Sequence, residues 1–291
     1  MRIVSYSSGG ERDYGFLVSP EQFVPRYFVE DALRMELPKN VKDLLSDGEL
    51  LELVNSVVGK IPIESFSVES VHLEPPIPNP GKIICLGLNY LDHAEEAGVE
   101  PPEDPIIFLK PATALIGPYD PIVKPRIVEE LDYEIELAAV IGCRCRDVEP
   151  EEACEHVFGY MILNDVSARD VQFRGAQWIR GKMFDTFAPT GPSLVSRDEI
   201  GDPHNLRMLT RVNEEIRQNS STSRMIKKLP EIVSTLSQGV TLEPGDIISI
   251  GTPAGVGLYQ KPEPKLLEPG DVVEMWIERI GTIRNPVISP E

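Results

Sequence analysis

The sequence predicts an α+β fold dominated by β-strands, with short peripheral helices and a small N-terminal domain. The 291 residues include 27 prolines, about twice the average usage, which favours turns and short strands over long helices. Most apolar runs are short and end at Gly, Pro or Asp, as strands do in β-rich proteins. The length corresponds to one large domain with a small appendage.

Residues 1–75 are predicted to form the small domain. Apolar and polar residues alternate on both sides of Gly9-Gly10, which is typical of a β-hairpin. The stretch 41–58 has apolar residues at helical spacing and predicts a helix. Four prolines within 74–81 indicate a stiff linker. We therefore assign 76–291 to a second domain.

The second domain is predicted to consist mainly of strands. Six apolar segments are bounded by Gly, Pro or Asp, at 83–87, 106–109, 133–141, 160–164, 246–250 and 272–277. Two helices are expected, over 149–157 with a proline in its first turn and over 224–238 ending before a glycine. The pentapeptide Leu-Glu-Pro-Gly-Asp occurs twice, at 242–246 and 267–271, and its central Pro-Gly fits a type II turn.

The charge and the cysteines limit the classes of partner and compartment. The 47 acidic and 28 basic residues give a net charge of −19, which argues against nucleic acid and membrane surfaces as partners. The run 137–143, among the longest apolar runs, is far shorter than the ~20 residues that span a bilayer. No signal peptide is evident, and the four cysteines lack zinc-site spacing. We predict free thiols and a cytoplasmic location.

Two glutamates form the most prominent chemical pattern. Residues of a strand alternate between its faces, so Glu134 and Glu136 should point the same way. Two carboxylates on a largely apolar strand need a compensating cation. A hard dication such as Mg²⁺ or Mn²⁺ prefers such oxygen ligands. From the spacing alone, a solvated face of an edge strand is the more ordinary interpretation, because Glu-x-Glu is a common pattern.

A second polar cluster follows the predicted strand 160–164. Asp165 stands at the strand end, where a rigid scaffold holds accessible polar groups. Arg169 lies four residues further on and could bind an anion through its guanidinium fork. The alternative for Asp165 is a helix N-cap, and Asp170 is better suited to a surface ion pair.

Six motifs in a fixed order give the chain a family resemblance. They are Gly87-Leu-Asn-Tyr90 with His93, Phe108-Leu-Lys-Pro111, Tyr133-Glu-Ile-Glu-Leu137, Asn164-Asp-Val-Ser-Ala-Arg-Asp170, Gly181-Lys-Met-Phe-Asp-Thr186 and Gly251-Thr-Pro-Ala-Gly-Val-Gly257. Together they resemble the fumarylacetoacetate hydrolase family from about residue 80 to residue 288. The resemblance implies a mixed β-sandwich roll, a homodimer, and one Mg²⁺ or Mn²⁺ ion held by Glu134, Glu136 and Asp165.

His93 and Glu96 are the candidate acid–base pair. They are three residues apart, on one face of a predicted short helix. Histidine titrates near neutral pH, and a carboxylate can orient it. A surface His–Glu pair is the ordinary alternative. The family resemblance implies that the pair activates water on a lid, and Gly98 with the prolines that follow it suits a mobile lid with stiff ends.

The remaining candidates are cationic and polar residues in the same motifs. Lys182 lies in an apolar and aromatic stretch, where an exposed lysine is the ordinary interpretation. The resemblance implies that Lys182 stabilises a developing enolate. Expected substrate contacts are Arg169, Gln172, Thr252 and Lys110. The loop 251–257 lacks the Gly-Lys-Ser/Thr ending of a phosphate-binding loop, which argues against nucleotide binding.

These features predict a Mg²⁺- or Mn²⁺-dependent hydrolase that cleaves a C–C bond in a small 2,4-diketo acid, such as an acylpyruvate or fumarylpyruvate. The ion would bind the 2-oxo-carboxylate end of this small anionic 2-oxo acid, while His93, oriented by Glu96, activates water. An oxaloacetate-type decarboxylase and a 2-hydroxyhepta-2,4-diene-1,7-dioate isomerase are alternatives on the same metal platform. A non-enzymatic binding module is a third possibility.

Overall fold

The centre of the fold is an antiparallel pair of buried strands, β11 (Ile135–Ile141) and β12 (Val157–Asn164). The structure is a computed structural model that describes residues 1–60 and 65–290. Every residue of β11 is buried. Its odd-numbered side chains pack into one hydrophobic core, and the even-numbered ones beyond Glu136 pack into another. A strand that is buried on both faces has a nearly continuous apolar sequence.

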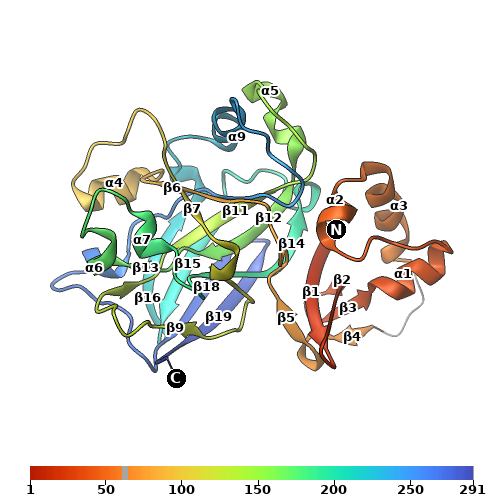
Figure 1. Cartoon of the computed structure of the whole chain (residues 1–291), viewed down its shortest axis with the longest axis horizontal. Helices are drawn as coiled ribbons and strands as arrows, with labels where there is room; N and C mark the ends of the chain where they lie inside the picture. The colour runs from red at the N-terminus through yellow and green to blue at the C-terminus, as the bar shows by residue number, and fades with distance from the viewer. Residues whose placement is uncertain (61–64, 291) are drawn as a thin grey trace.

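These two strands belong to a twelve-stranded mixed sheet (Figure 1). Its order is β4-β3-β2-β1-β14-β12-β11-β17-β6-β7, with β5 paired to β1 and β8 to β14. Neighbours are antiparallel except for β17–β6 and β14–β8. The further strands are β1 (Arg2–Ser8), β2 (Glu11–Ser19), β3 (Gln22–Pro25), β4 (Phe66–Ser67), β5 (His72–Glu74), β6 (Ile83–Gly87), β7 (Ile106–Lys110), β8 (Leu115–Ile116), β14 (Ala188–Ser196) and β17 (Ile247–Ser249).

A five-stranded sheet covers one face of the large sheet. Its order is β16 (Glu215–Ser221), β15 (Arg207–Val212), β18 (Val272–Ile277), β19 (Gly281–Ile288) and β9 (Ile122–Val123). Apolar residues of β15, β18 and β19 share the first core with the odd-numbered residues of β11. A short pair, β10 (Leu131–Asp132) with β13 (Ser167–Ala168), lies where β11 begins and β12 ends. The predicted β-dominated α+β roll is confirmed.

The helices are short and peripheral, as predicted. They are α1 (Arg26–Leu33), α2 (Val41–Leu45), α3 (Gly48–Val58), α4 (Leu91–Ala97), α5 (Pro150–Ala153), α6 (Arg169–Gln172), α7 (Ile179–Lys182), α8 (Arg197–Ile200) and α9 (Leu229–Ser237). Among the described residues, no helix has the length and apolar character needed to cross a membrane. All four cysteines are free thiols, as expected.

The N-terminal strands and helices lie together on one side of the molecule, where Figure 1 shows β1–β4 and α1–α3 in red to orange. The predicted hairpin is present as β1 and β2. Strand β1 also pairs with β14, with Ile3 opposite Leu194, so the large sheet extends from this region into the rest of the molecule. We propose that residues 1–75 form the small domain and 76–291 the second one.

Two of the predicted helices are interrupted. The helix predicted over 41–58 is divided into α2 and α3, because Asp47 accepts a hydrogen bond from the backbone N–H of Leu50 (3.0 Å) and thereby starts a new helix. The helix predicted over 149–157 is only the single turn α5, followed by a 3₁₀ turn at Cys154–His156. Local apolar spacing does not reveal either interruption.

The helix predicted over 224–238 begins five residues later, at Leu229. The residues before it pair elsewhere: the N–H of Ile226 donates to the carbonyl of Asn89 (2.8 Å), and Met225 forms a β-bridge with Tyr90. Proline in the first turn of α9 fits this start, because proline has no N–H to donate.

The repeated pentapeptide forms the same turn twice, as predicted. Gly245 and Gly270 both have positive φ, at 82° and 106°, which the third position of a type II turn requires. In each copy the final aspartate accepts a hydrogen bond from the backbone N–H three residues earlier, at 2.7 Å for Asp246 and 2.8 Å for Asp271. Both copies therefore form the same hydrogen-bonded turn immediately before a strand.

Candidate active site

Three buried carboxylates converge at the junction of β11 and β12. Glu134 directly precedes β11, Glu136 lies within it, and Asp165 directly follows β12. The N–H of Asp165 donates to the carbonyl of Glu134 (2.9 Å), which holds the strand ends together. One oxygen of each carboxylate lies within 4.8 Å of the others. The predicted strand 133–141 begins only at Ile135, yet Glu134 and Glu136 still reach the same site.

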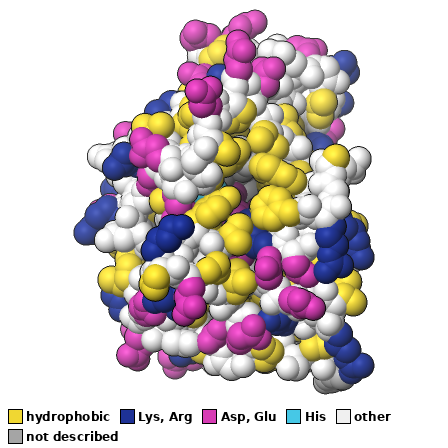
Figure 2. Space-filling model, turned by 90° about the vertical axis from the view of Figure 1, so that its left-hand side faces the viewer, with side chains coloured by type: hydrophobic (Ala, Val, Ile, Leu, Met, Phe, Trp, Pro, Cys, Tyr) yellow, Lys and Arg dark blue, Asp and Glu magenta, His cyan; other side chains and the backbone are white. Residues whose placement is uncertain are grey.

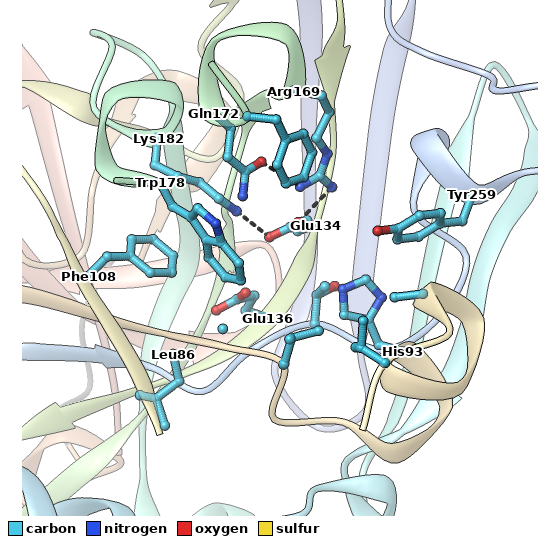
Figure 3. A pocket seen from close by; sticks show the side chains of 16 residues that line it. Leu86, His93, Phe108, Glu134, Glu136, Arg169, Gln172, Trp178, Lys182 and Tyr259 are labelled. Atoms are coloured by element: carbon cyan, nitrogen blue, oxygen red, sulfur yellow. Dashed lines mark hydrogen bonds and ion pairs between the residues drawn. The ribbon is translucent and has the colours of Figure 1, made fainter. Parts of the chain in front are cut away.

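Three buried cations contact this triad, and two of them, Lys182 and Arg169, line the pocket (Figure 3). Lys182 Nζ lies 2.6 Å from Glu134 Oε2 and 2.7 Å from Asp165 Oδ2. Arg169 Nη2 lies 2.6 Å from Glu134 Oε1. Burial alone would raise the pKa of Glu134, but the charges of Lys182 and Arg169 outweigh burial and lower this pKa to about 2. Glu134 is therefore held as a carboxylate.

Among the described residues, no lysine or arginine forms an ion pair with Glu136. Its Oε2 accepts hydrogen bonds from Ser249 Oγ (2.5 Å) and from the N–H of Gly251 (3.0 Å). Burial, followed by the charges of Asp165 and Glu134, raises the pKa of Glu136 well above its ordinary value. A further positive charge at this point would relieve the repulsion between the carboxylates.

The donor set fits a hard dication. With Asp132, the site holds four buried carboxylates against three buried cations, Lys110, Arg169 and Lys182, which leaves one negative charge (4 − 3 = 1) when all are ionised. Mg²⁺ and Mn²⁺ prefer carboxylate oxygens and keep positions open for substrate. Glu134, Glu136 and Asp165 are the residues that would hold such an ion.

Lys110 lies behind the triad, and its side chain is fully buried. Its Nζ pairs with Asp165 Oδ1 (2.7 Å) and donates to the backbone carbonyls of Val166 (3.1 Å), Lys182 (2.6 Å) and Phe187 (2.8 Å). These bonds fix Asp165 and the backbone of Lys182. The geometry points to a positioning role for Lys110, in place of the substrate contact expected from the sequence.

Asp132 is a buried residue of the site that the sequence analysis missed. It pairs with Arg169 Nε (2.8 Å) and accepts hydrogen bonds from the N–H groups of Gly257 (2.7 Å) and Leu258 (3.0 Å). It therefore joins Arg169 to the glycine-rich loop. A Cβ atom at position 257 would lie 2.6 Å from Asp132 Oδ1, so glycine at 257 was a signal of this close approach.

The predicted His93–Glu96 pair forms on α4. His93 Nδ1 lies 3.4 Å from Glu96 Oε2, a loose contact of the kind seen before substrate binds. The N–H of Gly255 donates to both oxygens of Glu96, at 2.9 and 3.1 Å. Because Glu96 acts as an acceptor, it favours the His93 tautomer with hydrogen on Nδ1, which leaves Nε2 as a base. The ring of Tyr259, also missed from the sequence, stands 6.0 Å from His93.

A pocket of about 180 Å³ brings these groups together. It is lined by residues of α4, α6 and α7, together with Glu134 and Glu136. Figure 3 shows His93 and Tyr259 on one side and the aromatic rings of Phe108 and Trp178 on the other. Figure 2 views the molecule from this side and shows hydrophobic side chains gathered around a hollow. The volume fits a small organic acid better than a drug-sized ligand.

The other predicted substrate contacts differ in whether their polar groups are directed into the pocket or are used in hydrogen bonds within the protein. Gln172 Oε1 accepts a hydrogen bond from Arg169 Nη1 (3.1 Å), and Figure 3 shows the amide nitrogen of Gln172 directed into the pocket. Thr252 also lines the pocket, but its hydroxyl donates to the carbonyl of Ile135 (2.9 Å) and accepts from Gln218 Nε2 (2.9 Å). The Thr252 hydroxyl therefore holds the loop to β11. Asp170 forms the expected ion pair, with Arg174 (2.8 Å).

A β-rich roll with a carboxylate cluster and a His–Glu pair in one pocket defines a class of enzymes that act on small molecules. The chain belongs to the fumarylacetoacetate hydrolase family, because the family model described as fumarylacetoacetate (FAA) hydrolase C-terminal matches residues 82–288. The resemblance seen in the sequence motifs is thus confirmed.

Relatives and solved structures support this assignment over most of the chain. "Oxaloacetate tautomerase FAHD2A, mitochondrial" from Bos taurus is 44% identical over 262 residues, which cover 89% of this chain and 82% of that protein. The crystal structure of a 2-hydroxyhepta-2,4-diene-1,7-dioate isomerase from Mycobacterium marinum has a TM-score of 0.76 and 36% identity, covering 99% of this chain and 98% of that one. That of a maleylpyruvate hydrolase from Sphingobium has a TM-score of 0.80 and 33% identity, with full coverage of both chains.

We expect Mn²⁺ or Mg²⁺ to stabilise the protein through the triad. An ion at 100 times its Kd should add about 2.7 kcal/mol to the free energy of unfolding, and thermal unfolding with Mn²⁺ or EDTA would measure the shift. Glu136→Gln should remove most of it, because the amide supplies no charge. Glu151→Gln, on an exposed residue of α5, is the matched control. Equal Mn²⁺ shifts in both variants would contradict the assignment.

Proposed function

We propose that the protein catalyses keto–enol tautomerisation of a small 2-oxo dicarboxylic acid such as oxaloacetate, with Mg²⁺ or Mn²⁺ at the triad. The observation that carries this proposal is the His93–Glu96 pair, which faces the carboxylate triad across a pocket of about 180 Å³. The relative from Bos taurus, named an oxaloacetate tautomerase, supports the choice of substrate.

A dication held by the triad would supply a Lewis acid that polarises the 2-oxo group of the substrate. His93 Nε2 takes a proton from C3 of the keto form and returns it to the enolate oxygen, which gives the enol with no net change in protons. Glu96 accepts a hydrogen bond from Nδ1 and stabilises the imidazolium while it holds the proton.

The pocket cations favour an anionic substrate despite the acidic composition of the chain. Arg169 and Lys182 line the pocket beside Glu134 and place positive charge where the enolate develops. The amide nitrogen of Gln172 is positioned to donate to a carboxylate or carbonyl oxygen. Homodimeric assembly and a cytoplasmic location stay predictions.

Hydrolysis of a 2,4-diketo acid is the second candidate function. The same His93–Glu96 pair could remove a proton from water instead of from C3. The Sphingobium structure, named a maleylpyruvate hydrolase, favours this alternative. Decarboxylation and diene isomerisation need the same enolate stabilisation and stay further alternatives.

Ultraviolet absorbance of enolic oxaloacetate tests the proposal. We expect the enzyme with Mg²⁺ or Mn²⁺ to accelerate equilibration of the keto and enol forms without lowering total oxaloacetate, and EDTA to abolish the effect. Formation of pyruvate would instead indicate a decarboxylase, and consumption of 2,4-diketo acids a hydrolase. Equilibration at the uncatalysed rate with either metal would overturn the tautomerase proposal.

A further inference from the structure

We propose that Trp178 sets the upper size limit of the substrate, by closing the end of the pocket that faces away from His93. This inference rests on the proposed function, in which the 2-oxo-carboxylate end of the substrate lies at the triad. The substrate chain beyond that end meets the apolar wall formed by Leu86, Phe108 and Trp178. Trp178 is the largest side chain of this wall.

The indole of Trp178 occupies space that a side chain at position 87 would fill. A Cβ atom on Gly87 would lie 2.6 Å from Cζ3 and 3.4 Å from Cε3 of the indole. Gly87 does not have the positive φ that would require glycine for backbone reasons. We infer that glycine at this position makes room for the indole.

The backbone that carries Trp178 is fixed to the catalytic elements. The N–H of Gly181, in α7, donates to the carbonyl of Trp178 (3.0 Å). A Cβ atom on Gly181 would lie 2.6 Å from Gln172 Cβ and 2.7 Å from the carbonyl oxygen of Ala168. Helices α6 and α7 are therefore in close contact, and Trp178 keeps a defined position relative to Gln172 and Lys182.

A rigid apolar wall discriminates by size, because a larger substrate can bind only if the wall moves or is removed. One methylene group in a hydrophobic pocket changes kcat/KM by about 10–200-fold. Removing the indole should therefore extend the range of substrates toward 2-oxo acids with longer distal chains. Oxaloacetate should lose contact area and be turned over less efficiently.

The experiment compares kcat/KM for oxaloacetate with that for 2-oxo and 2,4-diketo acids of increasing chain length. For Trp178→Ala, we expect the ratio of long-chain to short-chain kcat/KM to rise by about 10-fold or more, and Trp178→Phe should give a smaller shift of the same sign. Tyr119→Ala is the matched control, since Tyr119 is an aromatic residue that is 54% exposed and lies outside this pocket; its ratio should stay unchanged.

A second pair of variants tests the contact with Gly87. Gly87→Ala should displace the indole into the pocket and lower kcat/KM for all substrates, whereas adding Trp178→Ala should restore the values of Trp178→Ala alone. Two results would overturn this inference but not the proposed function. The first is turnover of oxaloacetate with the same chain-length profile in wild type and Trp178→Ala. The second is that the changes in kcat/KM caused by Gly87→Ala and Trp178→Ala simply add in the double variant. If the wild type turns over no 2-oxo acid, both this inference and the proposed function fail.

Discussion

Replacing Lys182 by methionine is expected to lower the free energy of unfolding of the metal-free protein by about 3–5 kcal/mol, the usual effect of removing one partner from a buried ion pair. Lys182 Nζ contacts both Glu134 (2.6 Å) and Asp165 (2.7 Å), and all three side chains are buried. The variant leaves those buried carboxylates with less positive charge beside them. Urea denaturation with EDTA measures the loss.

The effect of Lys182→Met should depend on pH and on metal. The folded-state pKa of Glu134 is about 2, below the usual 4.5, so its stabilising contribution is present above pH 4.5 and declines as the pH falls toward 2. The difference between wild type and variant should narrow over that interval. Mn²⁺ should recover part of the loss at neutral pH, because it supplies positive charge to the same oxygens.

Lys39→Met, at an exposed lysine, is the matched control and should change stability by less than about 0.5 kcal/mol. A loss below about 1 kcal/mol in Lys182→Met, the range of an exposed ion pair, would mean that Lys182 is not needed to neutralise the triad. An undiminished loss under acid conditions would show that the Glu134 charge is not the cause.

His93→Ala is expected to lower kcat for tautomerisation by about 10²–10⁴-fold, the usual contribution of general acid–base catalysis. His93 is the histidine that lines the pocket, with Nε2 available and Nδ1 held by Glu96. Glu96→Gln should cause a smaller loss, because the imidazole is retained and only its orienting carboxylate is changed. Stopped-flow absorbance of enolic oxaloacetate measures both variants.

His72→Ala is the control for this prediction, since His72 is exposed and pairs with Asp120 (3.2 Å) away from the pocket. Thermal unfolding with Mn²⁺ should show the same metal-induced shift in His93→Ala as in wild type, which separates loss of the base from loss of the metal site. A decrease of less than 10-fold in kcat would exclude His93 as the main proton carrier.

The parts of the site that could be predicted from the sequence are those set by short spacing. Glu134 and Glu136 are two residues apart beside one strand, and His93 and Glu96 are three apart on one helix turn. Such spacings fix the direction of the two side chains relative to each other, even when the tertiary structure is unknown. The order of the motifs then assigned Asp165 to the same site.

The rest depends on contacts between distant parts of the chain. Asp132 binds the N–H of a glycine 125 positions away, and Lys110 binds the carbonyl of Lys182, 72 positions away. Trp178 reaches Gly87 across three intervening α-helices and several strands. The periodicity of the local sequence does not indicate such contacts. It does not indicate the late start of α9 either, because that start depends on pairing with Asn89.

The two faces of β11 also bear on how the N-terminal region can be altered. Ala138 and Val140 share one core with Ile3, Leu44 and other residues before position 75. A truncation that removes this region would expose part of the β11 face that carries Ala138 and Val140, which is also the face of Glu136. The proline-rich segment thus separates the two regions along the sequence, but their stabilities depend on a shared hydrophobic core. A protein shortened at this segment would expose apolar surface and would be prone to aggregate before its activity could be assayed.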